Sequence, residues 1–247
     1  MAGKRTYGDS CGIARALDLV GERWGLLVVR ELLLGPKRFT DLRNGLVHLS
    51  ADVLAQRLRE LEEAGIVRRG KLPPPAGSRI YELTDWGREL EPVVLALGRW
   101  GSRAPMPPGA GPLRVDSLVL ALKTVFAPER AGALAGRWEL RLGDQRFTAR
   151  VAGQRLEVER GSPSDPDAVI ETDPETLQQV LWHGRSPSDG ALRISGDRAK
   201  AKRFLGLFPA PEPATREGGR ETSPMVSFLA QASPPEGAAS GARAAWA

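Results

Sequence analysis

The segment from residue 39 to residue 83 constrains the fold of this 247-residue chain more than any other. It begins with a short amphipathic stretch at Phe39. A longer stretch opened by Ser50 follows, in which three leucines recur at helical spacing (Leu54, Leu58 and Leu61). Ser50 suits the N-cap of a helix. Two strand-like segments, 66–72 and 78–83, then flank a proline-rich tip that cannot continue either strand. The pattern predicts helix, turn, helix and a two-stranded wing.

Further helices are expected on both sides of this segment. Apolar residues at helical spacing predict helices over 9–20 and 24–32, and Phe39, Leu42 and Leu46 mark the short third one. A fifth helix is expected to run from Thr84 to Trp100. Pro92 lies inside it and should bend it, because proline removes a backbone hydrogen bond.

The pattern changes after residue 103. Residues 104–114 are rich in proline and glycine, which is typical of a linker. Alternating apolar and polar residues beyond it predict an antiparallel meander of three strands, a further strand over 168–172 and one over 192–194. Helices are expected near Leu118–Val125 and after the capping residues Asp173 and Asp197. We therefore expect a two-domain α+β protein: domain 1–103, linker 104–114, domain 115–209 and a disordered tail, 210–247.

Composition excludes several classes of function. The single cysteine, Cys11, rules out an internal disulfide, and with only two histidines a metal site is not expected. No nucleophile or acid–base pair stands in a recognisable motif, so we expect neither an enzyme nor a cofactor. No apolar run approaches the length of a membrane span, and no signal peptide is visible, which predicts a cytoplasmic protein.

Charge and the helix over 50–64 point to duplex DNA. The net charge is +5, and residues 1–103 hold 17 Lys and Arg against 13 Asp and Glu. The side of the helix opposite its leucines carries Gln56 and Arg59, which can pair with adenine and guanine respectively. Arg57 lies on its flank. The alternative is a solvated charged surface, but the basic wing that follows favours DNA. The candidate contacts are Arg38, Thr40, Ser50, Asp52, Gln56, Arg57, Arg59, Arg68, Lys71 and Arg79.

Several spaced motifs in residues 8–101 resemble the HxlR family of bacterial winged-helix repressors. They include Gly21-Glu22-Arg23-Trp24, Arg38-Phe39-Thr40-Asp41-Leu42, Gln56-Arg57-Leu58-Arg59-Glu60-Leu61-Glu62 and Tyr81-Glu82-Leu83-Thr84. The resemblance implies a homodimer built from the first and last helices of the domain. Each subunit would place its recognition helix in a major groove of double-stranded DNA and its wing along the backbone. The apolar side of residues 86–100 would then be a dimer surface.

Cys11 falls where this family resembles thiol-based sensors of oxidants and electrophiles. Sensing requires a thiolate, which a nearby Arg15 or a helix start would favour. The alternative is a small residue with no sensing role. A redox-sensing repressor and a plain one are both compatible with the sequence.

Residues 115–208 resemble sterol-carrier-protein domains, through Gly136-Arg137-Trp138-Glu139-Leu140 and Leu192-Arg193-Ile194-Ser195-Gly196-Asp197. This resemblance implies an α/β sandwich with an antiparallel sheet and a cavity for a lipid-like molecule. The candidate lining residues are Trp138, Phe147, Leu177, Leu181, Trp182, Phe204 and Phe208. The alternative is that these side chains only fill a core.

Together these patterns predict a transcriptional regulator, a repressor, that binds operator DNA as a homodimer. Its C-terminal domain would take an apolar small-molecule effector. The alternative is a lipid carrier whose winged helix serves only for protein pairing. The sequence identifies neither the operator nor the effector.

Overall fold

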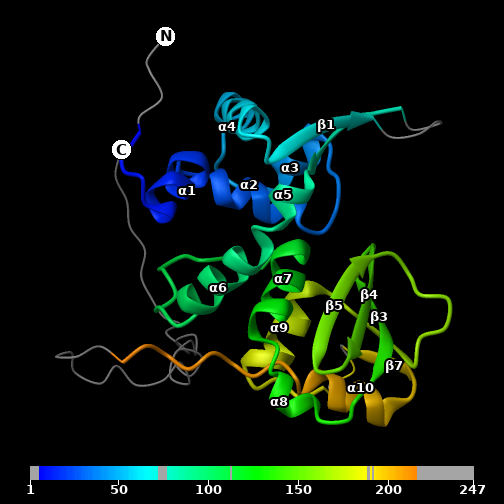
Figure 1. Cartoon of the computed structure of the whole chain (residues 1–247). Coiled ribbons are helices and arrows are strands. Elements are labelled where there is room, and N and C mark those ends of the chain that lie inside the picture. The colour runs from blue at the N-terminus through cyan, green and yellow to red at the C-terminus, as the bar shows by residue number, and fades with distance from the viewer. Residues whose placement is uncertain (1–5, 72–76, 112, 188–189, 191, 216–247) are drawn as a thin grey trace, which may run out of the picture. The chain divides into compact units, whose positions relative to one another are not determined.

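The expected helices and wing of the N-terminal half are present. The structure, a computed structural model, describes residues 6–71, 77–111, 113–187, 190 and 192–215 (Figure 1). The proline-rich tip of the wing and most of the predicted disordered tail, 210–247, lie outside these residues. Helices α1 (Gly12–Val20), α2 (Gly25–Leu32), α3 (Phe39–Gly45) and α4 (Ala51–Glu63) precede the strands β1 (Val67–Lys71) and β2 (Arg79–Leu83).

Leucine spacing and capping explain α4. Leu54, Leu58 and Leu61 are buried in one cluster with Val28 and Val29 of α2. At the start of the helix, the Oγ of Ser50 accepts a hydrogen bond from the backbone N–H of Val53 (3.3 Å). This N-cap satisfies one of the amides that a helix start leaves unpaired, so the predicted boundary is confirmed.

The predicted fifth helix is two helices. Helix α5 covers Asp85–Arg88, and α6 covers Glu91–Gly101. Pro92 lies in the first turn of α6, where its missing N–H removes no helical hydrogen bond. The expectation of one continuous helix bent at Pro92 was therefore wrong. The proline helps to start a new helix.

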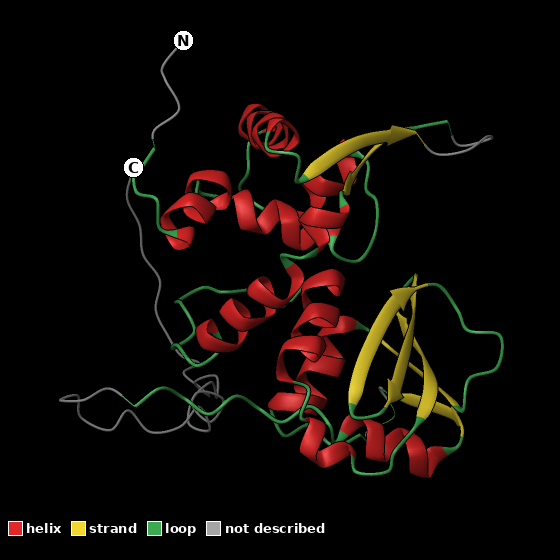
Figure 2. Cartoon of the chain, in the orientation of Figure 1, coloured by secondary structure: helices red, strands yellow, loops and turns green. Residues whose placement is uncertain are grey.

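In the described part of the C-terminal lobe, residues 115–208, one sheet of five strands packs with four helices. Figure 2 shows the sheet and the helices of this lobe. The strands are β3 (Gly136–Leu142), β4 (Gln145–Ala152), β5 (Arg155–Arg160), β6 (Ala168–Thr172) and β7 (Arg193–Gly196), in the order β5-β4-β3-β6-β7. The meander β3-β4-β5 is antiparallel as predicted. However, β3 and β6 pair in parallel, with Trp138 opposite Ala168. The sheet is thus mixed: its other pairs, β5-β4, β4-β3 and β6-β7, are antiparallel as expected, and the parallel pair was not foreseen.

The helices of this lobe are α7 (Val115–Val125), α8 (Pro128–Ala131), α9 (Pro174–Trp182) and α10 (Arg198–Leu205). Asp173 and Asp197 cap α9 and α10 as predicted, by accepting hydrogen bonds from the N–H groups of Thr176 and Lys200. The short α8 was not foreseen. Apolar residues of α7, α9 and α10 share one buried cluster with the inward side chains of the sheet. The predicted α+β composition is confirmed.

The winged helix (residues 12–101) and the C-terminal lobe belong to one compact unit, Met1–Pro213. Helix α6 packs against α7, and Lys123 of α7 forms an ion pair with Glu91 of α6. The Nε of Arg99 donates to the carbonyl oxygen of Thr124 (3.1 Å). Within the described residues, no helix is both long and apolar enough to cross a membrane.

Candidate DNA interface

The start of α3 presents a cation and a hydroxyl to solvent. Arg38 precedes the helix, and its backbone N–H donates to Oδ2 of Asp41 (3.2 Å), which fixes the first turn. The side chains of Arg38 and Thr40 are both exposed. Exposed donors at a helix start suit the binding of phosphate.

The solvent side of α4 carries the predicted polar face. Asp52, Gln56 and Arg59 are exposed, on the side of the helix away from its buried leucines. The Oε1 of Gln56 accepts from Arg59 (2.6 Å), and its Nε2 donates to Glu60 (2.7 Å). Such exposed contacts are weak in water, so a base edge could replace them at little cost.

Arg57 is placed less favourably for base contact. Its side chain is only 16% exposed, and NH1 lies 2.6 Å from Glu60 and 3.5 Å from Glu22. Glu22 belongs to the turn between α1 and α2. Arg57 therefore ties α4 to that turn, and it would have to leave both carboxylates to contact DNA.

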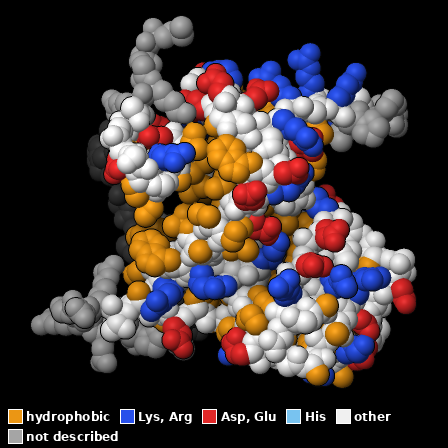
Figure 3. Space-filling model, in the orientation of Figure 1, with side chains coloured by type: hydrophobic (Ala, Val, Ile, Leu, Met, Phe, Trp, Pro, Cys, Tyr) orange, Lys and Arg blue, Asp and Glu red, His pale blue; other side chains and the backbone are white. Residues whose placement is uncertain are grey.

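The described part of the wing carries four cations, of which two are paired with carboxylates and two are not. Arg68 pairs with Glu82 (2.9 Å), and Arg69 pairs with Glu62 of α4 (2.9 Å). Lys71 and Arg79 are cross-strand partners next to the tip, and both are exposed. Within the described residues, neither of them has a carboxylate partner. Figure 3 shows Lys and Arg side chains standing out along the upper right edge, where Figure 1 places the wing.

A second surface of the winged helix is apolar and exposed. Ile13 of α1 is 73% exposed, and Val93, Leu97 and Trp100 of α6 are 53%, 49% and 72% exposed. Hydrophobic side chains gather around α6 in Figure 3. We call Ile13, Leu17, Val93, Leu97 and Trp100 the apolar face.

Cys11 is exposed and is the residue just before α1. Its backbone N–H donates to Oδ1 of Asp9 (2.8 Å). Cys11 lies two residues before Ile13 of the apolar face in the sequence, and its sensing role stays a prediction. In the part of the chain that is described, no three His, Cys, Asp or Glu side chains are grouped so as to hold a metal ion.

The residues proposed to line a lipid cavity are packed against one another. Trp138 stacks on Phe204 with ring centroids 4.5 Å apart, and Phe208 meets Phe204 edge-on at 5.0 Å. Phe147 and Leu177 are also buried, whereas Leu181 and Trp182 are partly buried. The Nε1 of Trp182 donates to the carbonyl oxygen of Phe208 (3.2 Å). These contacts are those of a filled core.

Two open hollows lie elsewhere. One, of about 420 Å³, is lined by Gly136, Arg137, Arg150, Asp167 and their neighbours. The other, of about 440 Å³, is lined by the end of α3, the turn between α3 and α4, and Arg114. None of the seven cavity candidates lines either hollow.

A core built by helices α1 to α4, a capped helix with a polar outer side and a basic wing define the class of winged helix-turn-helix proteins. Comparison with known proteins agrees. A family model described as HxlR-like helix-turn-helix matches residues 19–107. YvaP of Bacillus subtilis, named an uncharacterized HTH-type transcriptional regulator, is 38% identical over 88 residues, which are 36% of this chain and 82% of YvaP.

A second relative, sll1512 of Synechocystis, has the same kind of name and is 39% identical over 95 residues, 38% of this chain and 70% of its own length. Among solved structures, the redox regulator HypR in its reduced form is 34% identical over 37% of this chain and 90% of that chain, with a TM-score of 0.35. This chain therefore belongs to the HxlR-like helix-turn-helix family and is a transcriptional regulator of that type. The family match ends at Pro107 and gives the C-terminal lobe no assignment.

Proposed function

We propose that this protein binds a specific operator duplex as a homodimer and represses transcription. The exposed side of α4 would enter the major groove, with Gln56 and Arg59 at the base edges. Arg38, Thr40 and the wing would contact phosphates on either side. A dimer bound at a promoter blocks access to it, which is why we propose repression.

The pairing of Lys71 with Arg79 carries this proposal. The two cations are direct cross-strand partners, so their side chains lie on the same side of the wing. Like charges in this arrangement repel each other. A phosphate between or beside them removes the repulsion, whereas protein pairing alone gives no reason for it. This observation favours DNA binding over a lipid carrier that uses the winged helix only for protein pairing.

The apolar face supports the homodimer. Monomeric soluble proteins rarely expose a contiguous group of large apolar side chains. A two-fold axis through this face would bury α1 and α6 of one subunit against the same helices of its partner. The two copies of α4 would then reach successive major grooves, about 34 Å apart.

We assign no apolar effector to the C-terminal lobe, because the aromatic residues of this lobe fill a core. A thiol switch at Cys11 would modify the proposed function and not replace it.

The test is selection of duplexes from a random library by the purified full chain. We expect enrichment of a sequence with two half-sites in inverted orientation, whose centres are about 10 base pairs apart. Enrichment of a single half-site would contradict the homodimer. Recovery of an unenriched library, with weak binding to every duplex, would contradict operator recognition.

A further inference from the structure

Lys37 is buried, although its neighbour Arg38 is exposed. Lysine is almost never buried without a partner. The Lys37 side chain is only 10% exposed, and its Nζ lies 2.5 Å from Oε2 of Glu31 and 2.5 Å from Oδ2 of Asp116. Lys37 is thus fully occupied inside the protein and cannot contact phosphate.

One of its two partners comes from the C-terminal lobe. Asp116 lies in the first turn of α7, and its side chain is 10% exposed. Both of its carboxylate oxygens accept from NH2 of Arg160, at 2.5 Å. Arg160 lies over the ring of Phe147 (5.1 Å) and donates to Gln145 (2.7 Å). Asp116 is therefore held from the side of the sheet while it reaches Lys37.

The backbone of Lys37 connects this ion pair to the wing. Its N–H donates to the carbonyl oxygen of Tyr81 (3.0 Å), and its carbonyl oxygen accepts from the N–H of Tyr81 (2.8 Å). Tyr81 belongs to β2. The next residue, Arg38, begins α3. Lys37 thus joins the C-terminal lobe, the wing and the first DNA-facing helix.

The surroundings of Lys37 leave the segment little freedom. Leu34 is buried in the cluster of the C-terminal lobe, although it lies in the winged-helix half of the sequence. The carboxylate of Glu31 fits against α3 because residue 45 is glycine, and a Cβ there would overlap it. Apolar packing and ion pairs therefore hold residues 31–37 on both sides.

We infer that Asp116 is a positioning residue for DNA recognition. By holding Lys37 it fixes the wing and the start of α3 relative to each other, so the C-terminal lobe contributes to operator affinity without touching DNA. This rests on the proposed function. Binding is strongest when the groups that contact phosphate are already held in position, because ordering them on binding lowers the affinity. Asn at position 116 keeps the shape of the side chain but leaves Lys37 and Arg160 without their shared carboxylate.

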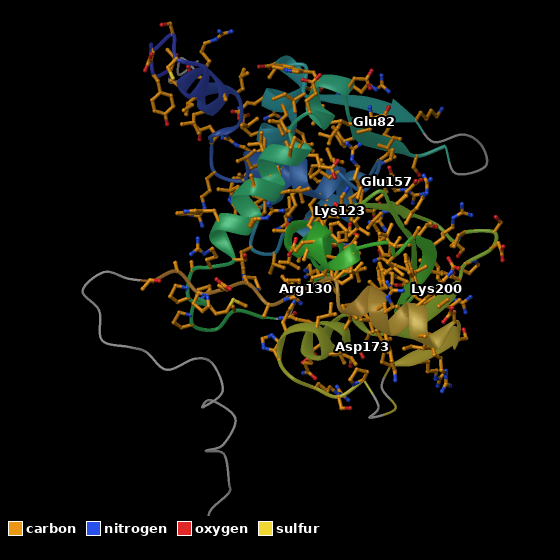
Figure 4. All side chains as sticks on the ribbon, turned by 60° about the horizontal axis from the view of Figure 1, so that its bottom comes forward. Glu82, Lys123, Arg130, Glu157, Asp173 and Lys200 are labelled. Atoms are coloured by element: carbon orange, nitrogen blue, oxygen red, sulfur yellow. The ribbon has the colours of Figure 1, made fainter. Side chains whose placement is uncertain are left out.

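The experiment compares Asp116→Asn, Lys37→Met and the double variant with the full-length wild type. Hydrogen exchange at the amides of Lys37 and Tyr81 is measured without DNA. Affinity for the selected operator is measured at several salt concentrations. Glu157→Gln is the matched control, because Glu157 forms an exposed ion pair with Arg150 in the same lobe (Figure 4).

We expect Asp116→Asn to speed exchange at both amides about tenfold. We expect it to weaken operator binding about 3- to 30-fold, with an unchanged salt slope because no phosphate contact is lost. The double variant should bind the operator with about the affinity of whichever single variant binds less tightly, because both substitutions remove the same ion pair. Glu157→Gln should change neither quantity. If Asp116→Asn does not fold, Arg160→Gln should shift both quantities in the same direction by a smaller factor.

Unchanged exchange in Asp116→Asn would overturn the inference. So would faster exchange with unchanged operator affinity, or additive effects of the two substitutions. A wild type that binds no duplex specifically would contradict the proposed function instead. In that case the exchange data still decide whether Asp116 positions the wing.

Discussion

At the scale of single residues, the surface that we propose faces DNA contains side chains that are free to bind and side chains that hold the fold. Gln56, Arg59, Lys71 and Arg79 are exposed. Arg57 and Lys37 are also basic residues of the winged helix, but both are occupied by carboxylates. Charge and sequence position alone do not separate the two groups, whereas exposure and partners do.

Replacement of Gln56 by alanine should relax base preference. Loss of one bidentate base contact costs about 1–3 kcal/mol of discrimination at that base pair. Affinities for operators that carry single base changes measure this. Arg57→Ala is the comparison, and we expect a smaller change in preference because Arg57 already pairs with Glu22 and Glu60. Equal preference loss in both variants would contradict the placement of Gln56 at the base edges.

Replacement of Lys71 by alanine should weaken binding evenly across sequences. A phosphate contact carries no sequence information, and its loss should reduce the salt slope by about 1. Arg150→Ala removes an exposed cation from the C-terminal lobe, and we expect it to leave the slope unchanged. A Lys71→Ala variant with wild-type affinity and slope would place the wing away from DNA.

At the scale of helices and strands, local signals predicted what local chemistry controls. Ser50, Asp173 and Asp197 cap the helices that follow them, and the leucine spacing of α4 gave its buried side correctly. The parallel pairing of β3 with β6 was missed, because it depends on contacts between residues about 30 positions apart. The separation of α5 from α6 was missed because a proline in a helical pattern is compatible with a bend or with a new start.

The C-terminal lobe should lose stability on acidification. The hydrogen bond from Lys200 of α10 (Figure 4), and then the one from the backbone N–H of Arg137, hold the pKa of Asp167 below its usual range. The hydrogen bond from the N–H of Thr176 likewise lowers the pKa of Asp173. A carboxylate whose pKa is lowered by folding stabilises the folded state when the pH is above its ordinary pKa, which is about 4. This stabilisation is lost as the pH falls below that value towards the lowered pKa.

Chemical unfolding between pH 6 and pH 3 measures this loss. The free energy of unfolding should fall towards pH 3 in the wild type, and it should fall less steeply in Asp167→Asn, which no longer has the ionised carboxylate. Identical pH profiles would show that this ion pair does not contribute.

At the scale of the whole molecule, the contacts between the winged helix and the C-terminal lobe were the feature least predictable from the sequence. Lys37 and Asp116 are far apart in the chain. In the sequence, Lys37 has the appearance of one residue of a basic turn, and Asp116 that of an acidic residue at a helix start. The sequence predicted a proline-rich linker between two domains. The structure adds buried ion pairs and the insertion of Leu34 into the neighbouring core.

Assembly should depend on the apolar face. Leu97→Asp places a charge in the middle of it, and a buried unpaired charge is costly, so we expect monomers at micromolar concentration. Sedimentation velocity measures the change. Val47→Asp is the matched control, because Val47 is 46% exposed and Leu97 is 49% exposed, but Val47 lies in the turn between α3 and α4. Dimers in Leu97→Asp would move the interface elsewhere.

The affinity of the full chain for its selected operator, measured beside a scrambled duplex of the same composition at physiological salt, tests the central claim most directly. We predict that the operator is bound at least about 10³-fold more tightly, as is usual for specific recognition. Equal affinity for the two duplexes would contradict the assignment of α4 and the wing as a sequence-reading surface.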